Sequence, residues 1–301
     1  MDAKARGYWF DASTERLTVP LWKNYHYLRA YWYGIPSKIK SMLVGDYEEC
    51  HFHIGVHKTA TTYLQEQLSL GNLDRCGVKY YPLKMLRDRI YRYGFASVGR
   101  RVSGHNRLIL SDENVLNGTE YLHQGVYSDS CERIGWYIAQ IKAKKLVVYI
   151  NIRNFADFYT SAYCEHLRHF PYQSFSAYLA DIDLSSLSWV DVFGPLIKAH
   201  PNIEFRVFNF DTFRQDKKCL LSSISFGLLN DYSSKIKASR SSFTEREVAQ
   251  LSGNSQWIAT SEESKYAPLD QSVVEQAKRA VVDDMQCLNT FRNVTLLNPI
   301  W

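Results

Sequence analysis

The ten residues from His53 to Thr62, HIGVHKTATT, bring a lysine, hydroxyl groups and small side chains together between a predicted strand and a predicted helix. Backbone N–H groups in the first helical turn have no partner within the helix, so such a junction can bind an anion. A lysine adds positive charge, and threonine hydroxyls add hydrogen-bond donors. The segment therefore predicts a phosphate-binding loop, formed by His57, Lys58, Thr59, Ala60, Thr61 and Thr62.

This loop differs from the Walker A motif, G-x-x-x-x-G-K-[ST]. Counting from Gly55, the sixth position is Ala60 and the seventh is Thr61, where Walker A requires lysine. Lys58 comes three residues before that position. A kinase with the usual nucleotide loop would also need magnesium ligands. We keep a P-loop-type kinase only as an alternative.

A second candidate phosphate ligand follows the apolar segment Lys145–Ile152, KLVVYINI. Arg153 comes directly after this predicted strand, and Ser161 lies eight residues further along, inside the next predicted helix. A guanidinium can bind phosphate through two parallel N–H bonds, and a serine two turns into the helix can point back toward the same oxygens. The alternative for Arg153 is a charge on the surface at a strand end.

A carboxylate pair follows the short apolar strand predicted over Arg107–Ser111. In an open parallel sheet, ligands bind at the carboxyl ends of the strands, so Glu113 is well placed to act as a general base. Two alternatives remain open. Asp112 and Glu113 could form a cap that offsets a helix dipole, or His57 could be the base, although its place within the loop favours an orienting role.

The segment HIGVHKTATTYLQ resembles the 5′-phosphosulfate loop of the sulfotransferases, K-[ST]-G-[ST]-[ST], and looks most like the bacterial branch, HIGxHKTGTTxLQ, with Ala60 in place of glycine. In that family an arginine at a strand end and a serine eight residues later bind the 3′-phosphate of the donor, and Arg153 and Ser161 match these positions. Bacterial members often show S-x-E-N where this chain has Glu113, and several carbohydrate sulfotransferases use a glutamate base. The resemblance spans residues 49 to about 260.

The resemblance implies an enzyme that uses 3′-phosphoadenosine 5′-phosphosulfate (PAPS) as donor, releases adenosine 3′,5′-bisphosphate (PAP) and needs no metal. Lys58 would stabilise the charge that grows on the bridging oxygen, and Arg240 would belong to a loop closing over the nucleotide; a solvated basic loop is the alternative. We expect the acceptor to be a hydroxyl of a carbohydrate or glycolipid. Candidate acceptor-side residues are His166, Arg168, Tyr172 and Trp189. A non-catalytic nucleotide-binding protein stays as an alternative.

The elements that must position these residues alternate between strands and helices. Strands are expected over 49–55, 107–111, 145–152 and 202–210, and helices over 61–70, 128–142, 155–170, 189–200 and 271–288. This alternation predicts an α/β fold with a P-loop-like parallel sheet flanked by helices. Aromatic-rich N-terminal and helical C-terminal additions would flank it.

Composition places few further limits on function. With 46% hydrophobic and 22% charged residues, the chain is globular, and disorder and collagen are excluded. A net charge of +5 suits an anionic small molecule as well as nucleic acid; the motifs lead us to expect a small-molecule nucleotide donor and no nucleic-acid partner. Oligomeric state is not predicted.

The six cysteines are scattered without a C-x-x-C pair, which argues against a zinc site and for reduced, mostly buried thiols in the cytoplasm. Residues 1–48 are rich in aromatic and basic side chains, and we expect them to pack on the domain formed by residues 49–301. The alternative is an element that contacts a membrane surface or an acceptor. No apolar run reaches the roughly 18 residues needed to span a bilayer.

Overall fold

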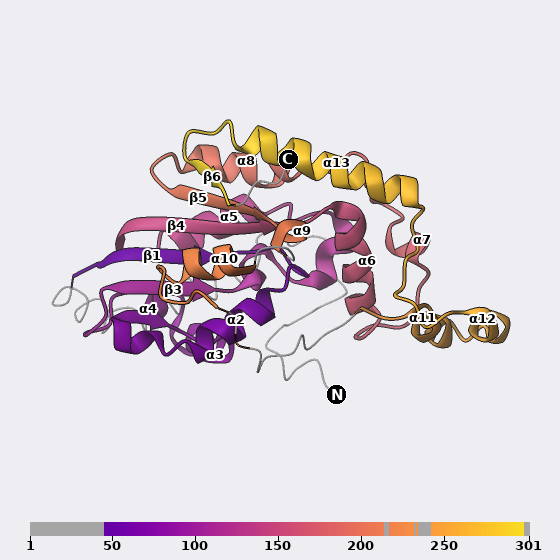
Figure 1. The fold of residues 1–301 in the computed structure, drawn as a ribbon, viewed down its shortest axis with the longest axis horizontal. Helices are drawn as coiled ribbons and strands as arrows, with labels where there is room; N and C mark the ends of the chain where they lie inside the picture. The colour runs from indigo at the N-terminus through magenta and orange to yellow at the C-terminus, as the bar shows by residue number, and fades with distance from the viewer. Residues whose placement is uncertain (1–44, 214–216, 232, 234–241, 298–301) are drawn as a thin grey trace, which may run out of the picture.

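The computed structural model describes residues 45–213, 217–231, 233 and 242–297. Six strands form one all-parallel sheet in the order β2-β3-β1-β4-β5-β6 (Figure 1). The strands are β1 Tyr47–His53, β2 Val78–Tyr80, β3 Arg107–Ser111, β4 Ala143–Ile152, β5 Glu204–Asn209 and β6 Val294–Leu296. The predicted α/β class, with a parallel sheet flanked by helices, is confirmed.

The strand order reverses at β1. Strands β2 and β3 lie on one side of β1, while β4, β5 and β6 lie on the other. His53 at the end of β1 pairs with Ser111 of β3 and with Tyr149 of β4. At such a reversal the connections leave in opposite directions and open a crevice at the carboxyl ends of the strands. All three candidate motifs follow strands that end at this edge.

Helices cover both faces of the sheet. On one face, α2 (Thr61–Leu70) and α10 (Lys217–Ile224) pack their leucines against apolar side chains of β3, β4 and β5. The other face is covered by α4 (Ala96–Gly99), α5 (Ser130–Ile138), α8 (Trp189–Ala199) and α13 (Gln271–Leu288). In Figure 1, α13 runs along the β6 side of the sheet, next to α8. Because both faces are buried, the central strand β4 has the continuous apolar sequence seen above.

Two further groups of elements complete the described chain. The remaining helices are α3 (Leu83–Tyr93), α6 (Phe155–His166), α7 (Phe175–Tyr178), α9 (Phe210–Phe213), α11 (Glu245–Ser252) and α12 (Ser255–Thr260), and short 3₁₀ helices span Leu73–Cys76, Glu113–Leu116 and Thr119–Gln124. Helices α11 and α12 extend away from the sheet (Figure 1). No helix among the described residues is both long and apolar enough to cross a membrane.

The predicted helices over 61–70 and 271–288 and the strand over 107–111 have the observed bounds. Other helices are shorter than expected: α6 ends at His166, shortly before Pro171, since a residue that precedes proline disfavours helical geometry. The C-terminal region is not helical throughout, because residues 294–296 form β6 against β5.

Residues 1–44 lie outside the described part of the chain, so the predicted N-terminal extension stays a prediction. β1 begins at Tyr47, two residues before the expected start of the domain. All six cysteines lie in the described residues, and none of them is part of a disulfide. Only Cys50 and Cys164 are buried, so the expectation of mostly buried thiols is wrong.

Candidate functional site

The loop between β1 and α2 has an unusual backbone. Lys58 and Ala60 both adopt left-handed conformations, with φ angles of 65° and 56°. Helix α2 begins directly after Ala60, without a side-chain cap and without an acidic residue in its first turn. Thr59 holds the loop by donating to the Val56 carbonyl at 2.6 Å. The turn therefore presents an uncapped helix N-terminus to the carboxyl edge of the sheet.

A buried hydroxyl at this helix start has no partner among the described residues. Thr61 is 5% exposed, and its Oγ1 makes no hydrogen bond. A buried polar group without a partner is costly, and such groups are rare in folded proteins. Together with the positive end of the α2 dipole, this hydroxyl suits a bound anion.

The loop leaves β1 through a narrow gap at Gly55. A Cβ at this position would lie 2.7 Å from His53 Nε2 and 3.2 Å from the Asn151 Cβ. His53 is itself held in place, because its Nδ1 lies 2.8 Å from Ser111 Oγ and burial lowers its pKa to about 4. Gly55 is thus needed for the close approach of the loop to β4, and His53 is a neutral, structural histidine.

Arg153 lies against this loop. It is 6% exposed, and its Nη1 donates to the Lys58 carbonyl at 3.1 Å. The guanidinium carbon lies 5.0 Å from the centre of the Phe210 ring, and Nη2 lies 3.6 Å from Asp157 Oδ2. Trp189 supports the Arg153 backbone, because its indole Nε1 donates to the Arg153 carbonyl at 2.7 Å. The arginine therefore approaches the phosphate loop rather than open solvent.

Helix α6 turns one face toward the same loop. Glu165, in its last turn, accepts a hydrogen bond from Lys58 Nζ at 3.1 Å. Ser161 precedes Glu165 by four residues, and residues at this spacing share a helix face. Ser161 is 6% exposed. Lys58 thus contacts both Arg153 and Glu165, and Ser161 lies on the face of α6 that carries Glu165.

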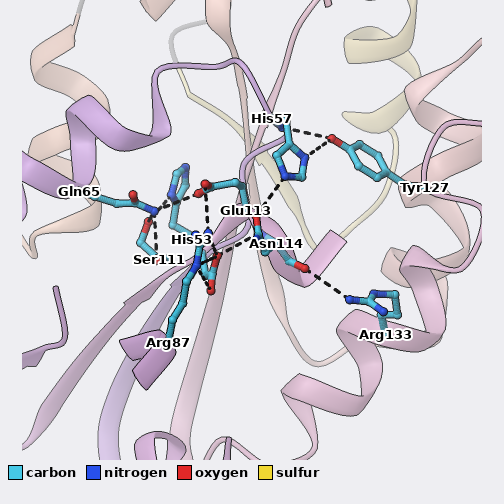
Figure 2. Close-up of polar contacts among 10 residues, drawn as sticks. His53, His57, Gln65, Arg87, Ser111, Glu113, Asn114, Tyr127 and Arg133 are labelled. Carbon is cyan, nitrogen blue, oxygen red and sulfur yellow. Dashed lines mark hydrogen bonds and ion pairs between the residues drawn. The ribbon is translucent and has the colours of Figure 1, made fainter. Parts of the chain in front are cut away.

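The two carboxylates after β3 share Arg87 and differ in their other partners. Asp112 caps the 3₁₀ helix Glu113–Leu116 by accepting from the Asn114 backbone N–H at 3.0 Å, and it binds Arg87 Nη2 at 2.6 Å. Glu113 Oε2 accepts from Gln65 Nε2 at 3.1 Å, and its Oε1 lies 3.3 Å from Arg87 Nη2 (Figure 2). The cap alternative therefore describes Asp112, while the Glu113 carboxylate faces α2.

Opposing effects act on the pKa of Glu113. Burial alone would raise it, but the positive charge of Arg87 and the hydrogen bond from Gln65 hold the pKa of Glu113 below its ordinary value. Burial lowers the pKa of His57, so this imidazole is neutral at neutral pH. Arg87 and the Gln65 amide are therefore the partners that keep Glu113 ionised, and an ionised carboxylate can accept a proton. Burial raises the pKa of Asp112 despite its pairing with Arg87.

Both ring nitrogens of His57 have partners. Nε2 lies 3.3 Å from Asn114 Oδ1, and Nδ1 lies 2.8 Å from the Tyr127 hydroxyl (Figure 2). Because the Asn114 oxygen only accepts, Nε2 carries the proton, and the Tyr127 hydroxyl donates to Nδ1. The same hydroxyl accepts from the His57 backbone N–H at 3.2 Å. This arrangement suits an orienting role for His57.

Several residues of the site were not predicted from the sequence. Gln65 lies four residues after Thr61 and Glu165 four residues after Ser161, so helical spacing from the predicted ligands could have found them. Arg87 and Tyr127 come from segments without a recognisable motif. Tyr127 also has a positive φ of 47°, and strained residues of this kind often occur at functional sites.

The candidate acceptor-side residues differ in their exposure. Trp189 is fully buried, so it cannot contact an acceptor directly, whereas Tyr172 is 38% exposed. A cavity of about 360 Å³ lies next to the His57 network and is lined by Tyr127, Phe155 and Asp191 among others. Another of about 460 Å³, lined in part by His51 and Phe226, includes none of the motif residues.

The described residues contain no group of three or more His, Cys, Asp or Glu side chains that could hold a metal ion. Arg240 lies outside the described residues, so its predicted role stays a prediction. The other predicted site residues follow β1, β3 and β4, whose carboxyl ends are adjacent.

Comparison of the chain with protein-family models, with curated proteins and with solved structures gives no match.

Proposed function

We propose that this protein is an O-sulfotransferase with a P-loop-like sheet, which transfers a sulfuryl group from PAPS to a hydroxyl of a carbohydrate or glycolipid. The observation that carries the proposal is the contact between the two candidate phosphate motifs: Arg153 Nη1 lies 3.1 Å from the carbonyl of Lys58. Glu113 follows the strand on the other side of β1. Phosphate ligands and a base thus follow three neighbouring strands.

Two sets of phosphate ligands in one site suit a donor with phosphate on two positions of its ribose. Lys58, Thr61 and the N-terminus of α2 form one set of donors, suited to the 5′-phosphosulfate. Arg153 and Ser161 form the other, suited to the 3′-phosphate. The buried Thr61 hydroxyl, which has no partner among the described residues, is the observation that tests the fit, and a phosphate oxygen would satisfy it.

Each residue of the site then has a task in sulfuryl transfer. The donor supplies an activated sulfur. Lys58 stabilises the negative charge on the oxygen that leaves with PAP, as the S–O bond to phosphate breaks and the bond to the acceptor oxygen forms. Glu113 takes the proton of the acceptor hydroxyl. Gln65 and Arg87 hold this carboxylate ionised and oriented.

Nucleotide selectivity tests the donor site. PAP should raise the melting temperature of the protein, and ATP with magnesium should not. Lys58→Ala should abolish transfer and weaken PAP binding by roughly 10- to 150-fold, because a hydrogen bond to a charged group contributes about 1.5–3 kcal/mol. Lys144→Ala is the matched control, since Lys144 pairs with Glu48 on the surface near the start of β1. Normal turnover by Lys58→Ala would refute the loop assignment.

Isotopically labelled donor in an acceptor screen tests the catalysis. In Glu113→Gln, kcat should fall by about 10²- to 10⁴-fold, the usual contribution of a general base. PAP affinity should stay within a few-fold. Asp112→Asn should instead lower stability, because Asp112 is the cap. Near-normal kcat in Glu113→Gln would transfer the role of base to His57. PAP binding without transfer to any acceptor would favour a non-catalytic nucleotide-binding protein.

A further inference from the structure

The proposed function makes Lys58 a ligand of the donor phosphates, and in this structure Lys58 forms an ion pair with Glu165. Its Nζ lies 3.1 Å from Glu165 Oε2, and the Lys58 side chain is 20% exposed. Glu165 is 7% exposed, so its charge is largely shielded from water. A partly buried ion pair of this geometry is screened less by salt than a surface pair.

Glu165 also has two other basic neighbours. His169 Nε2 lies 3.3 Å from its Oε1, and Arg168 Nε lies 3.8 Å from its Oε2. Removing the only partner of a buried charge is strongly unfavourable. Because Arg168 and His169 remain beside Glu165, Lys58 can turn away from the carboxylate without leaving its charge unpaired.

We infer that Glu165 is a positioning residue that holds Lys58 and competes with the donor for its ammonium group. This inference rests on the proposed function, because that function makes the donor the competitor. An anion that contacts the loop alone must displace the Glu165 carboxylate with a single group. A nucleotide that also binds Arg153 has a second set of contacts to offset this cost. The Lys58–Glu165 pair thereby weakens the binding of every anion at the loop, and the contacts with Arg153 let the two-phosphate donor bind despite this cost.

Glu165→Gln tests the competition directly. This substitution removes the competing charge but keeps the size of the side chain. PAP binding, measured by calorimetry, should become about 5- to 30-fold tighter, and the KM for the donor should fall without a rise in kcat. A purely structural role would weaken binding instead. Glu48→Gln is the matched control, because it changes the net charge of the protein by the same amount and breaks the surface pair with Lys144. It should change PAP affinity less than about twofold.

A double-mutant cycle isolates the pair. In a Lys58→Met background, Glu165→Gln should leave PAP affinity unchanged. Looser or unchanged binding in the single variant, or tightening that persists without Lys58, would overturn the inference. If Glu165→Gln does not fold, Glu165→Asp keeps the charge but shortens its reach, and it should tighten PAP binding by a smaller factor; unchanged binding would overturn the inference.

Inorganic sulfate separates this inference from the proposed function. Sulfate should raise the melting temperature of Glu165→Gln more than that of the wild type, whether or not PAP binds. Absence of PAP binding to every variant would refute the proposed function while the sulfate result still tests the pair. Equal stabilisation of both proteins by sulfate would refute the competition itself.

Discussion

Thr61→Val separates a binding hydroxyl from a structural one. Thr61 Oγ1 is buried and makes no hydrogen bond among the described residues. Valine has the same branched shape and replaces only the hydroxyl by a methyl group. If the hydroxyl binds a ligand, its loss should stabilise the ligand-free protein and weaken ligand binding.

The expected magnitudes follow from the burial of this group. An unsatisfied buried polar group costs about 1–3 kcal/mol, so Thr61→Val should gain about 1 kcal/mol of stability. For a domain of this size, that gain raises the melting temperature by about 2–4 °C. A hydrogen bond to a charged phosphate contributes about 1.5–3 kcal/mol, so PAP affinity should fall by roughly 10- to 150-fold.

Two neighbouring threonines are matched controls. Thr59→Val removes a hydrogen bond that exists, to the Val56 carbonyl at 2.6 Å, and should lower the melting temperature. Thr62 is exposed, so Thr62→Val should leave stability nearly unchanged. Thermal unfolding with and without PAP measures all three variants. A Thr61→Val protein that is destabilised like Thr59→Val, or that binds PAP normally, would refute the reasoning.

Three further predictions concern the same edge of the sheet. Ala60→Gly should raise the free energy of unfolding in urea by up to about 1 kcal/mol, because a left-handed φ of 56° is unfavourable for alanine but not for glycine. The greater conformational entropy of glycine in the unfolded chain offsets part of this gain. A decrease in the free energy of unfolding would contradict the prediction. Arg153→Met should weaken calorimetric binding of PAP far more than that of adenosine 5′-phosphosulfate, which lacks the 3′-phosphate, and equal losses would argue against the assignment. Burial depresses the pKa of His53 from 6.5 to about 4, so the unfolded chain binds more protons between these values. The protein should therefore keep its full stability above pH 6.5 and lose stability as the pH falls toward 4. A free energy of unfolding in denaturant that stays constant between pH 6.5 and 4 would contradict this prediction.

Much of the site was predictable because its residues are local to strand–helix junctions. The apolar run KLVVYINI predicts a strand buried on both faces, and β4 is that strand. Lys58, Arg153 and Glu113 each follow a predicted strand, and parallel strands direct their carboxyl ends to one edge. The motif residues could therefore be expected to meet without knowledge of the strand order.

The short edge strands could not be predicted in this way. β2 and β6 have three residues each. Three residues are too few for a hydropathy period to distinguish a strand from a loop. Their pairing with β3 and β5 exists only once the sheet has formed.

The sequence by itself determined the types of residue at the site and the elements that carry them, because periodicity and turn chemistry act over a few neighbouring positions. Tertiary structure alone decided their partners. Arg87 reaches Glu113 from α3, Tyr127 reaches His57 across 70 positions, and Glu165 reaches Lys58 across 107. Such contacts depend on how whole helices pack against the sheet, and local sequence carries no information on which distant charges that packing brings together.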